Sequence, residues 1–186
     1  MYSYKGLIIV TVVLVHLVTL IRGGVYSTDD KWILADRTQD LPDEVVLGGF
    51  DSDGYINYVG RVYYVNNVLP ARVFPELGRA TFNTDEANFA TITYEVLVSN
   101  ATVSYQWIRS FDGFREKNAV SVGTNVANER DFVCRTRCAG GVFIGTLYPS
   151  KRRCIVKYDN LQLHESDKYE ILVRQRQVAP FMPFAL

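Results

Sequence analysis

The stretch from Gly48 to Tyr64, GGFDSDGYINYVGRVYY, decides the fold of this chain. It places the polar residues DSDG (51–54) between two runs of residues that favour strands. An Asp-Gly pair permits the positive φ that a chain needs where antiparallel strands reverse. The aromatic and β-branched residues from Tyr58 to Val65 favour a strand over a helix. The stretch therefore predicts a β-hairpin.

The pattern recurs in the second half of the chain. GGFDSDGYINYVGRVYY aligns with VGTNVANERDFVCRTRC, which begins at Val122, 74 positions after Gly48. With one inserted residue, YEVLV from Tyr94 aligns with YEILV from Tyr169. No stretch keeps a 3.6-residue apolar period over three turns, as a helix requires. We therefore expect an all-β fold of two tandem, internally homologous antiparallel repeats related by a pseudo-twofold axis.

Outward from the repeats, the chain divides into four segments. We expect a signal peptide at 1–27, a first repeat at 28–99, a second repeat at 100–173 and a C-terminal tail at 174–186. The apolar run from Leu7 to Ile21 follows one positive charge and is shorter than the roughly 20 residues that span a bilayer. Small residues place the cleavage after Ser27. The predicted location is extracellular, and the alternative is a protein held in the lumen by its signal anchor.

Composition excludes several other classes of protein. The 186 residues are 48% hydrophobic and carry 20 basic against 20 acidic side chains. A chain this apolar is not disordered, and zero formal charge argues against a nucleic-acid partner held by phosphate contacts.

The predicted linker between the repeats holds Asn100-Ala101-Thr102, an N-glycosylation acceptor that suits an exposed segment of a secreted protein.

The three cysteines, Cys134, Cys138 and Cys154, all lie in the second half. On one strand the first two would be about 13 Å apart, too far for a disulfide. Cys154 therefore pairs with one of them, and we favour Cys138, beside the turn at 139–141. A zinc site completed by His164 is the rival interpretation, but the chain lacks the compact CxxC spacing of such sites.

Three kinds of residue recur at equivalent positions of the two halves: Arg61 and Arg135, Glu95 and Glu170, Trp32 and Trp107. We expect an arginine–glutamate ion pair within each repeat. We expect the two tryptophans to anchor the core at the start of each repeat.

The motif G-x-D-x-D-G-x-x-x-Y-V-G-R at 49–61, followed by PARV at 70–73 and YEVL at 94–97, resembles the DM9 repeat family. The resemblance covers most of the chain and implies a β-rich fold with pseudo-twofold symmetry. Members of the family include mannose-binding lectins of invertebrate immunity. The repeat also precedes a pore-forming module in natterin-like toxins, and this chain is too short to hold that module as well.

In the lectin members, an acidic residue of the D-x-D-G segment and the lysine of a P-G-K segment hold the sugar. Carried over, the resemblance assigns these roles to Asp51 and Arg72, with Asp53 a further candidate. A carboxylate and a cationic donor suit the vicinal hydroxyls of a sugar, because charge-assisted hydrogen bonds are the stronger ones. The second repeat has Asn125 and Thr146 at these positions, which predicts a degenerate second site.

The resulting hypothesis is a secreted, non-enzymatic protein that recognises mannose-type or microbial glycans in innate immunity. A homodimer is a further candidate assembly. The alternative is a structural or protein-interaction module whose sugar site has decayed. No catalytic motif occurs, and no cofactor or metal is expected. The DSDG segment is similar to part of an EF-hand loop, but Gly49 and Gly60 would stand where calcium needs oxygen ligands.

Overall fold

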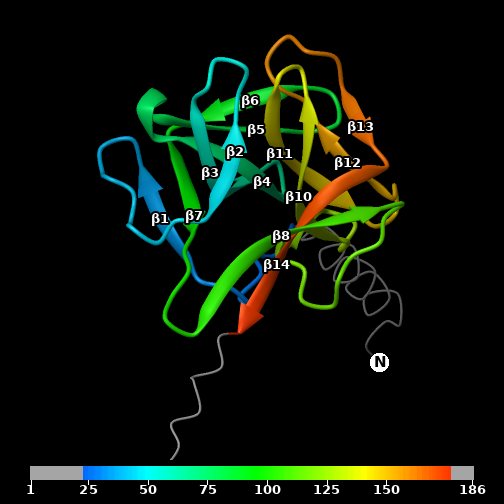
Figure 1. Cartoon of the computed structure of the whole chain (residues 1–186), viewed down its shortest axis with the longest axis horizontal. Helices are drawn as coiled ribbons and strands as arrows, with labels where there is room; N and C mark the ends of the chain where they lie inside the picture. The colour runs from blue at the N-terminus through cyan, green and yellow to red at the C-terminus, as the bar shows by residue number, and fades with distance from the viewer. Residues whose placement is uncertain (1–22, 177–186) are drawn as a thin grey trace, which may run out of the picture.

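The structure is a computed structural model that describes residues 23–176. These residues form an antiparallel, all-β fold, which confirms the predicted fold class (Figure 1). The remaining element is a 3-10 turn, η1 (Pro75–Leu77). Within residues 23–176 there is no helix with the length and apolar character to cross a membrane. Most of the predicted signal peptide (1–22) and the end of the predicted tail (177–186) lie outside the described residues.

The strands fall into two sets along the chain. The first set is β1 (Trp32–Asp36), β2 (Leu47–Phe50), β3 (Ile56–Tyr64), β4 (Asn67–Phe74), β5 (Arg79–Asn83), β6 (Asn88–Thr91) and β7 (Thr93–Leu97). The second set is β8 (Val103–Phe111), β9 (Ser121–Thr124), β10 (Arg130–Cys138), β11 (Gly141–Tyr148), β12 (Arg153–Val156), β13 (His164–Ser166) and β14 (Lys168–Arg176).

The strand pairings of the first set recur in the second. Strand β3 pairs with β2, β4 and β7, and β10 pairs with β9, β11 and β14. The outer pairs correspond as well, since β1 lies on β7 and β8 lies on β14. The aligned sequences therefore form the same pairings twice. The pseudo-twofold axis and the boundaries of the repeats stay predictions.

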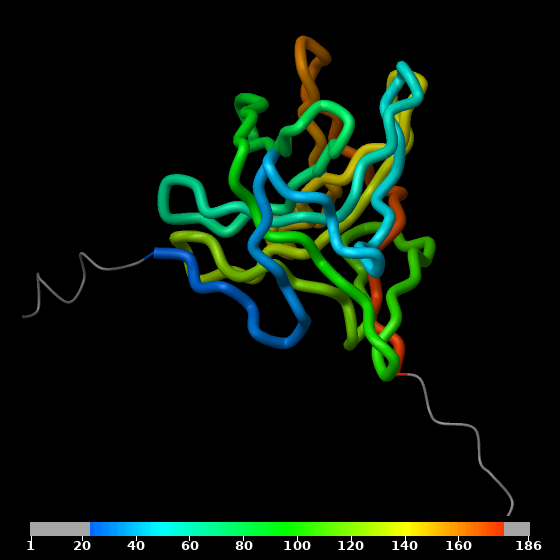
Figure 2. The backbone as a smooth tube through the Cα atoms, turned by 90° about the vertical axis from the view of Figure 1, so that its left-hand side faces the viewer, coloured from blue at the N-terminus to red at the C-terminus, as the bar shows by residue number. Residues whose placement is uncertain are grey.

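The two sets meet in one continuous sheet and share a core. Strand β2 joins β11 where Phe50 pairs with Val142. Figure 2 shows the loop at 51–55 running beside the turn at 139–140 between β10 and β11. A central apolar cluster draws on both sets: Val59, Val68 and Leu97 from the first, and Val120, Val122, Val133, Ile144 and Leu172 from the second. Two further clusters each lie within one half.

Each repeat contains the predicted arginine–glutamate ion pair. Nε of Arg61 lies 2.6 Å from Oε2 of Glu95, and the same atoms of Arg135 and Glu170 are also 2.6 Å apart. Both glutamates stand directly opposite their arginines across the strand pairing. The tryptophans are half-buried against the central cluster, and each stacks on a guanidinium: Arg61 lies 4.5 Å from the Trp32 ring and Arg135 lies 4.4 Å from the Trp107 ring.

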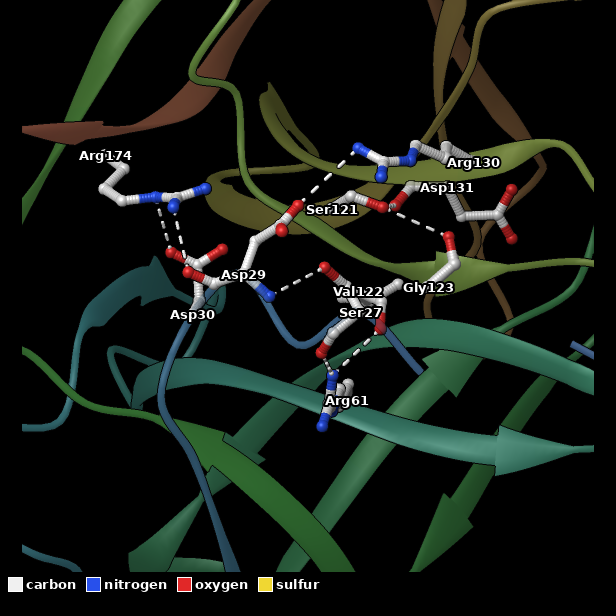
Figure 3. A network of polar contacts seen from close by, with 10 residues as sticks. All are labelled: Ser27, Asp29, Asp30, Arg61, Ser121, Val122, Gly123, Arg130, Asp131 and Arg174. Carbon is white, nitrogen blue, oxygen red and sulfur yellow. Dashed lines mark hydrogen bonds and ion pairs between the residues drawn. The ribbon is translucent and has the colours of Figure 1, made fainter. Parts of the chain in front are cut away.

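The same arginines cross from one half to the other. Nη1 of Arg61 donates to the carbonyl of Val122 at 3.0 Å, as Figure 3 shows. Nη1 of Arg135 donates to the carbonyl of Gly48 at 2.7 Å. Gly48 and Val122 are equivalent positions in the aligned halves. Each half therefore supplies an arginine that forms a hydrogen bond with the equivalent backbone carbonyl of the other half.

Residues 24–27 cover the Arg61 side of the first half. The carbonyl of Ser27 accepts a second hydrogen bond from Nη1 of Arg61 at 2.7 Å (Figure 3). The Tyr26 ring lies 4.4 Å from that guanidinium and 5.9 Å from the Tyr63 ring. The predicted cleavage point after Ser27 lies within this segment, and cleavage there stays a prediction.

The disulfide joins Cys134 to Cys154, so the preference for Cys138 was wrong. Their Cα atoms are 6.0 Å apart, and Cys138 has a free thiol. The register explains the choice, because Cys154 pairs with Leu147, and Leu147 pairs with Phe132 near the start of β10. Cys138 lies at the far end of β10.

Two further sequence-based boundaries can be compared with the strands. Strand β14 runs to Arg176, so residues 174–176, the start of the predicted tail, pair with β8 in the sheet. Asn100 is exposed between the two sets of strands, where its Oδ1 accepts hydrogen bonds from the backbone of Thr102 and Val103. Glycosylation at Asn100 stays a prediction.

Reduction of the disulfide should lower the free energy of unfolding by about 3 kcal/mol, because it releases a loop of 20 residues in the unfolded chain. Urea unfolding with and without a reductant measures the change. Cys138→Ser is the control and should leave the disulfide and the effect of the reductant unchanged. Peptide mapping that recovers Cys138 joined to Cys154 would contradict the pairing.

Arg135→Lys should lower the free energy of unfolding by about 1–2 kcal/mol, because an ammonium cannot reproduce the planar fork that binds Glu170 and the Gly48 carbonyl together. Chemical denaturation measures it, and Arg153→Lys, a change at an exposed arginine of the same half, is the control. Equal stability of the two variants would show that this fork does not hold the halves together.

Candidate functional site

Asp51 closes the loop that follows β2. One carboxylate oxygen, Oδ1, accepts hydrogen bonds from the backbone N–H groups of Asp53 at 3.0 Å and Tyr55 at 2.9 Å. Gly54 has a φ of +91°, which the reversal requires, and its N–H donates to the Asp51 carbonyl. The Asp51 residue is only 3% exposed, whereas Asp53 is exposed. Asp51 therefore holds the loop that the DSDG pattern predicts.

Arg72 lies in the middle of β4 and is 1% exposed. Five hydrogen bonds of its guanidinium match its five N–H donors, and the acceptors are Thr81 Oγ1, Asn83 Oδ1, Asn88 Oδ1 and the carbonyls of Ile144 and Lys157. Burial lowers the pKa of Arg72 to about 10. Because two acceptors belong to the second half, Arg72 ties β4 to that half.

Asp51 and Arg72 meet around Tyr158 of the second half. The Tyr158 hydroxyl donates to Oδ2 of Asp51 at 3.3 Å, and the Arg72 guanidinium lies 5.5 Å from the centre of the Tyr158 ring. The sugar-binding roles that the resemblance assigns require both charges to be accessible, whereas in the structure both are buried by neighbouring side chains. Sequence reasoning missed Tyr158, which lies 107 positions from Asp51 and carries no local signal of the contact.

The second half repeats the loop without the charge. Oδ1 of Asn125 accepts from the N–H groups of Ala127 at 2.9 Å and Glu129 at 3.1 Å, as Asp51 does from Asp53 and Tyr55. Thr146, at the position of Arg72, is 1% exposed. The loop geometry therefore does not depend on a carboxylate.

Asp131 is a buried carboxylate that sequence reasoning did not single out. It is 0% exposed, and its Oδ2 has no hydrogen-bond partner. Burial, together with the negative charges of Glu129 and Asp85, raises the pKa of Asp131 to about 8, and the positive charge of Lys151 opposes this rise. The equivalent residue of the first half is Asn57, which is also fully buried. Comparing the two halves position by position would have found this charge.

The described residues contain no candidate metal site. Among residues 23–176 no group of three or more His, Cys, Asp or Glu side chains is placed to hold a metal ion. The rival zinc interpretation is excluded by the disulfide, which uses two of the three cysteines.

The DM9 repeat matches residues 51–165, and the chain belongs to that family. The crystal structure of the nematode sperm cell motility protein MFP2B has the same fold, with a TM-score of 0.63 at 14% sequence identity. The similarity covers 82% of this chain and 48% of MFP2B, so the chain spans about half the length of that protein. No curated protein matches the chain.

Asp131→Asn should remove a pH-dependent loss of stability. The folded-state pKa of Asp131, about 8, lies above the ordinary pKa of 3.8 for an aspartate, so the folded protein binds the extra proton between these values. Below about pH 4 this carboxyl is protonated in both states and costs no stability. As the pH rises from there to 8, the free energy of unfolding falls by up to about 1.4 kcal/mol per pH unit.

Urea unfolding at several pH values from 4 to 8.5 measures the effect of Asp131→Asn. The variant and the wild type should match at pH 4, and the variant should be the more stable at pH 8.5. Asp167→Asn, a change at an exposed carboxylate, is the control. Parallel curves for wild type and Asp131→Asn would contradict the raised pKa.

Proposed function

We propose that this DM9 protein is secreted and non-enzymatic, and that it recognises mannose-type or other microbial glycans in innate immunity. The observation that carries the proposal is the Asp51 carboxylate, which is held by its own loop and directed at the Tyr158 hydroxyl at the junction of the halves. A carboxylate fixed in this way needs no rearrangement of its loop to accept a hydroxyl.

The proposed roles differ from those that the resemblance assigns. Asp51 Oδ2 accepts a sugar hydroxyl in place of the Tyr158 hydroxyl, to which it is bound at 3.3 Å. Tyr158 is only half-buried and offers its ring to the sugar. Arg72 is a positioning residue that supports this ring from the protein side, since its donors are already occupied. Asp53 lies exposed on the same loop and is a further candidate contact.

One observation favours the alternative, a structural or protein-interaction module with a decayed sugar site. Both charges of the expected site are buried, and every Arg72 donor has a partner within the protein. The similar nematode structure is that of a motility protein. In this reading Asp51 and Arg72 only stabilise the junction between the halves.

Binding to mannan separates the two functions. Asp51→Asn keeps both loop hydrogen bonds, because Asn125 makes them in the second half, but removes the negative charge. We expect it to weaken mannan binding at least tenfold, measured by retention on immobilised mannan or on a glycan array. EDTA should have no effect, because the proposed contact is metal-independent.

Asp167→Asn makes the same change of charge at an exposed position and should bind as the wild type does. Mannan binding by Asp51→Asn at wild-type strength would refute the proposed site. Wild-type protein that binds no glycan on the array would favour the interaction module.

A further inference from the structure

A second polar surface lies on the face of β8, β14 and β10, and Asp51 is not among its lining residues. The strand registers place Arg109 opposite Glu170 and Phe111 opposite Lys168, and Glu170 stands opposite Arg135 on the next strand. Side chains two positions apart on a strand share a face. Together with residues of β13, they line a hollow of about 770 Å³.

The hollow carries an excess of positive charge. Of its lining cations, Arg135 is paired with Glu170 at 2.6 Å. Arg109, Arg137 and Lys168 are exposed, and within the described residues none of them has a carboxylate at ion-pair distance. Three unpaired like charges in one concavity focus a positive potential that attracts anions.

The first half shows that the fold does not require these charges. The positions equivalent to Arg109, Arg137 and Lys168 are occupied by Leu34, Tyr63 and Thr93. There Tyr26 and the Ser27 carbonyl also cover Arg61. The second half has the same strand pairings with an open face and three added cations, so the difference belongs to the surface and not to the scaffold.

We propose that this hollow binds a saccharide that carries sulfate or carboxylate groups. Its cations come from three neighbouring strands, about 5 Å apart across the sheet and about 7 Å apart along a strand, a spread that suits several anionic groups better than one. Phe111, 61% exposed, offers an aromatic face to a sugar ring beside Lys168. Arginine forks bind sulfate and carboxylate oxygens in pairs.

This inference goes beyond the proposed function, because the hollow shares none of the residues around Asp51. It stands even if neutral glycans do not bind. The two sites are therefore tested with different probes and different variants.

The experiment measures binding of a heparin-derived tetrasaccharide to the protein by calorimetry at 50 and 150 mM NaCl. Arg109→Ala/Arg137→Ala should weaken binding at least tenfold and reduce its salt dependence. Arg37→Ala/Arg79→Ala removes two exposed arginines of the first half and should bind as the wild type does. Asp51→Asn should also bind the tetrasaccharide normally, whatever its effect on mannan.

Several outcomes would overturn the proposal. One is a wild-type protein that does not bind the tetrasaccharide. Another is an equal loss of affinity in the two double variants, which would mean that binding reflects only general charge attraction. Displacement of the tetrasaccharide by inorganic sulfate at matched ionic strength would instead define a single-anion site. Binding to phosphatidylserine vesicles without binding to the tetrasaccharide would assign the hollow to a membrane surface.

Discussion

The structure depends on two guanidinium groups that each hold both halves at once. Arg61 and Arg135 are neutralised by a glutamate of their own repeat, and each donates to a backbone carbonyl of the other repeat. Arg61 is buried and Arg135 half-buried, and breaking such ion pairs is destabilising, so these contacts favour one relative position of the two halves. The central apolar cluster fills the space between the same strands, and Arg72 adds a third tie through the carbonyls of Ile144 and Lys157.

Sequence repetition predicted those parts of the fold that appear twice. Strand alternation, the Asp-Gly turn and the paired Arg61–Glu95 and Arg135–Glu170 positions are all visible in the alignment of the halves, because the shift between them is 74 or 75 residues. The disulfide failed this reasoning, since the choice of Cys134 depends on the register of β11 and β12, which sequence spacing does not fix. The burial of Arg72 was missed for a similar reason, because two of its five acceptors, the carbonyls of Ile144 and Lys157, come from the other half.

The candidate site separates two roles that one residue can combine. Asn125 builds the same loop as Asp51 with no charge, so the negative charge of Asp51 is additional to what the backbone needs. Asp131 is the converse case, a carboxylate where the first half has the neutral Asn57, buried at a cost to stability near neutral pH. Such differences between duplicated halves mark the positions where the scaffold alone does not decide the residue.

The segment at 24–27 gives the predicted cleavage after Ser27 a structural consequence. While it is present, Tyr26 shields the guanidinium of Arg61. A protease that cut after Ser27 would uncover that group and leave it flanked by Leu34 and Tyr63, without the cations that surround Arg135. Cleavage there would uncover a second face that differs chemically from the one around Arg135, and it would do so without altering any strand.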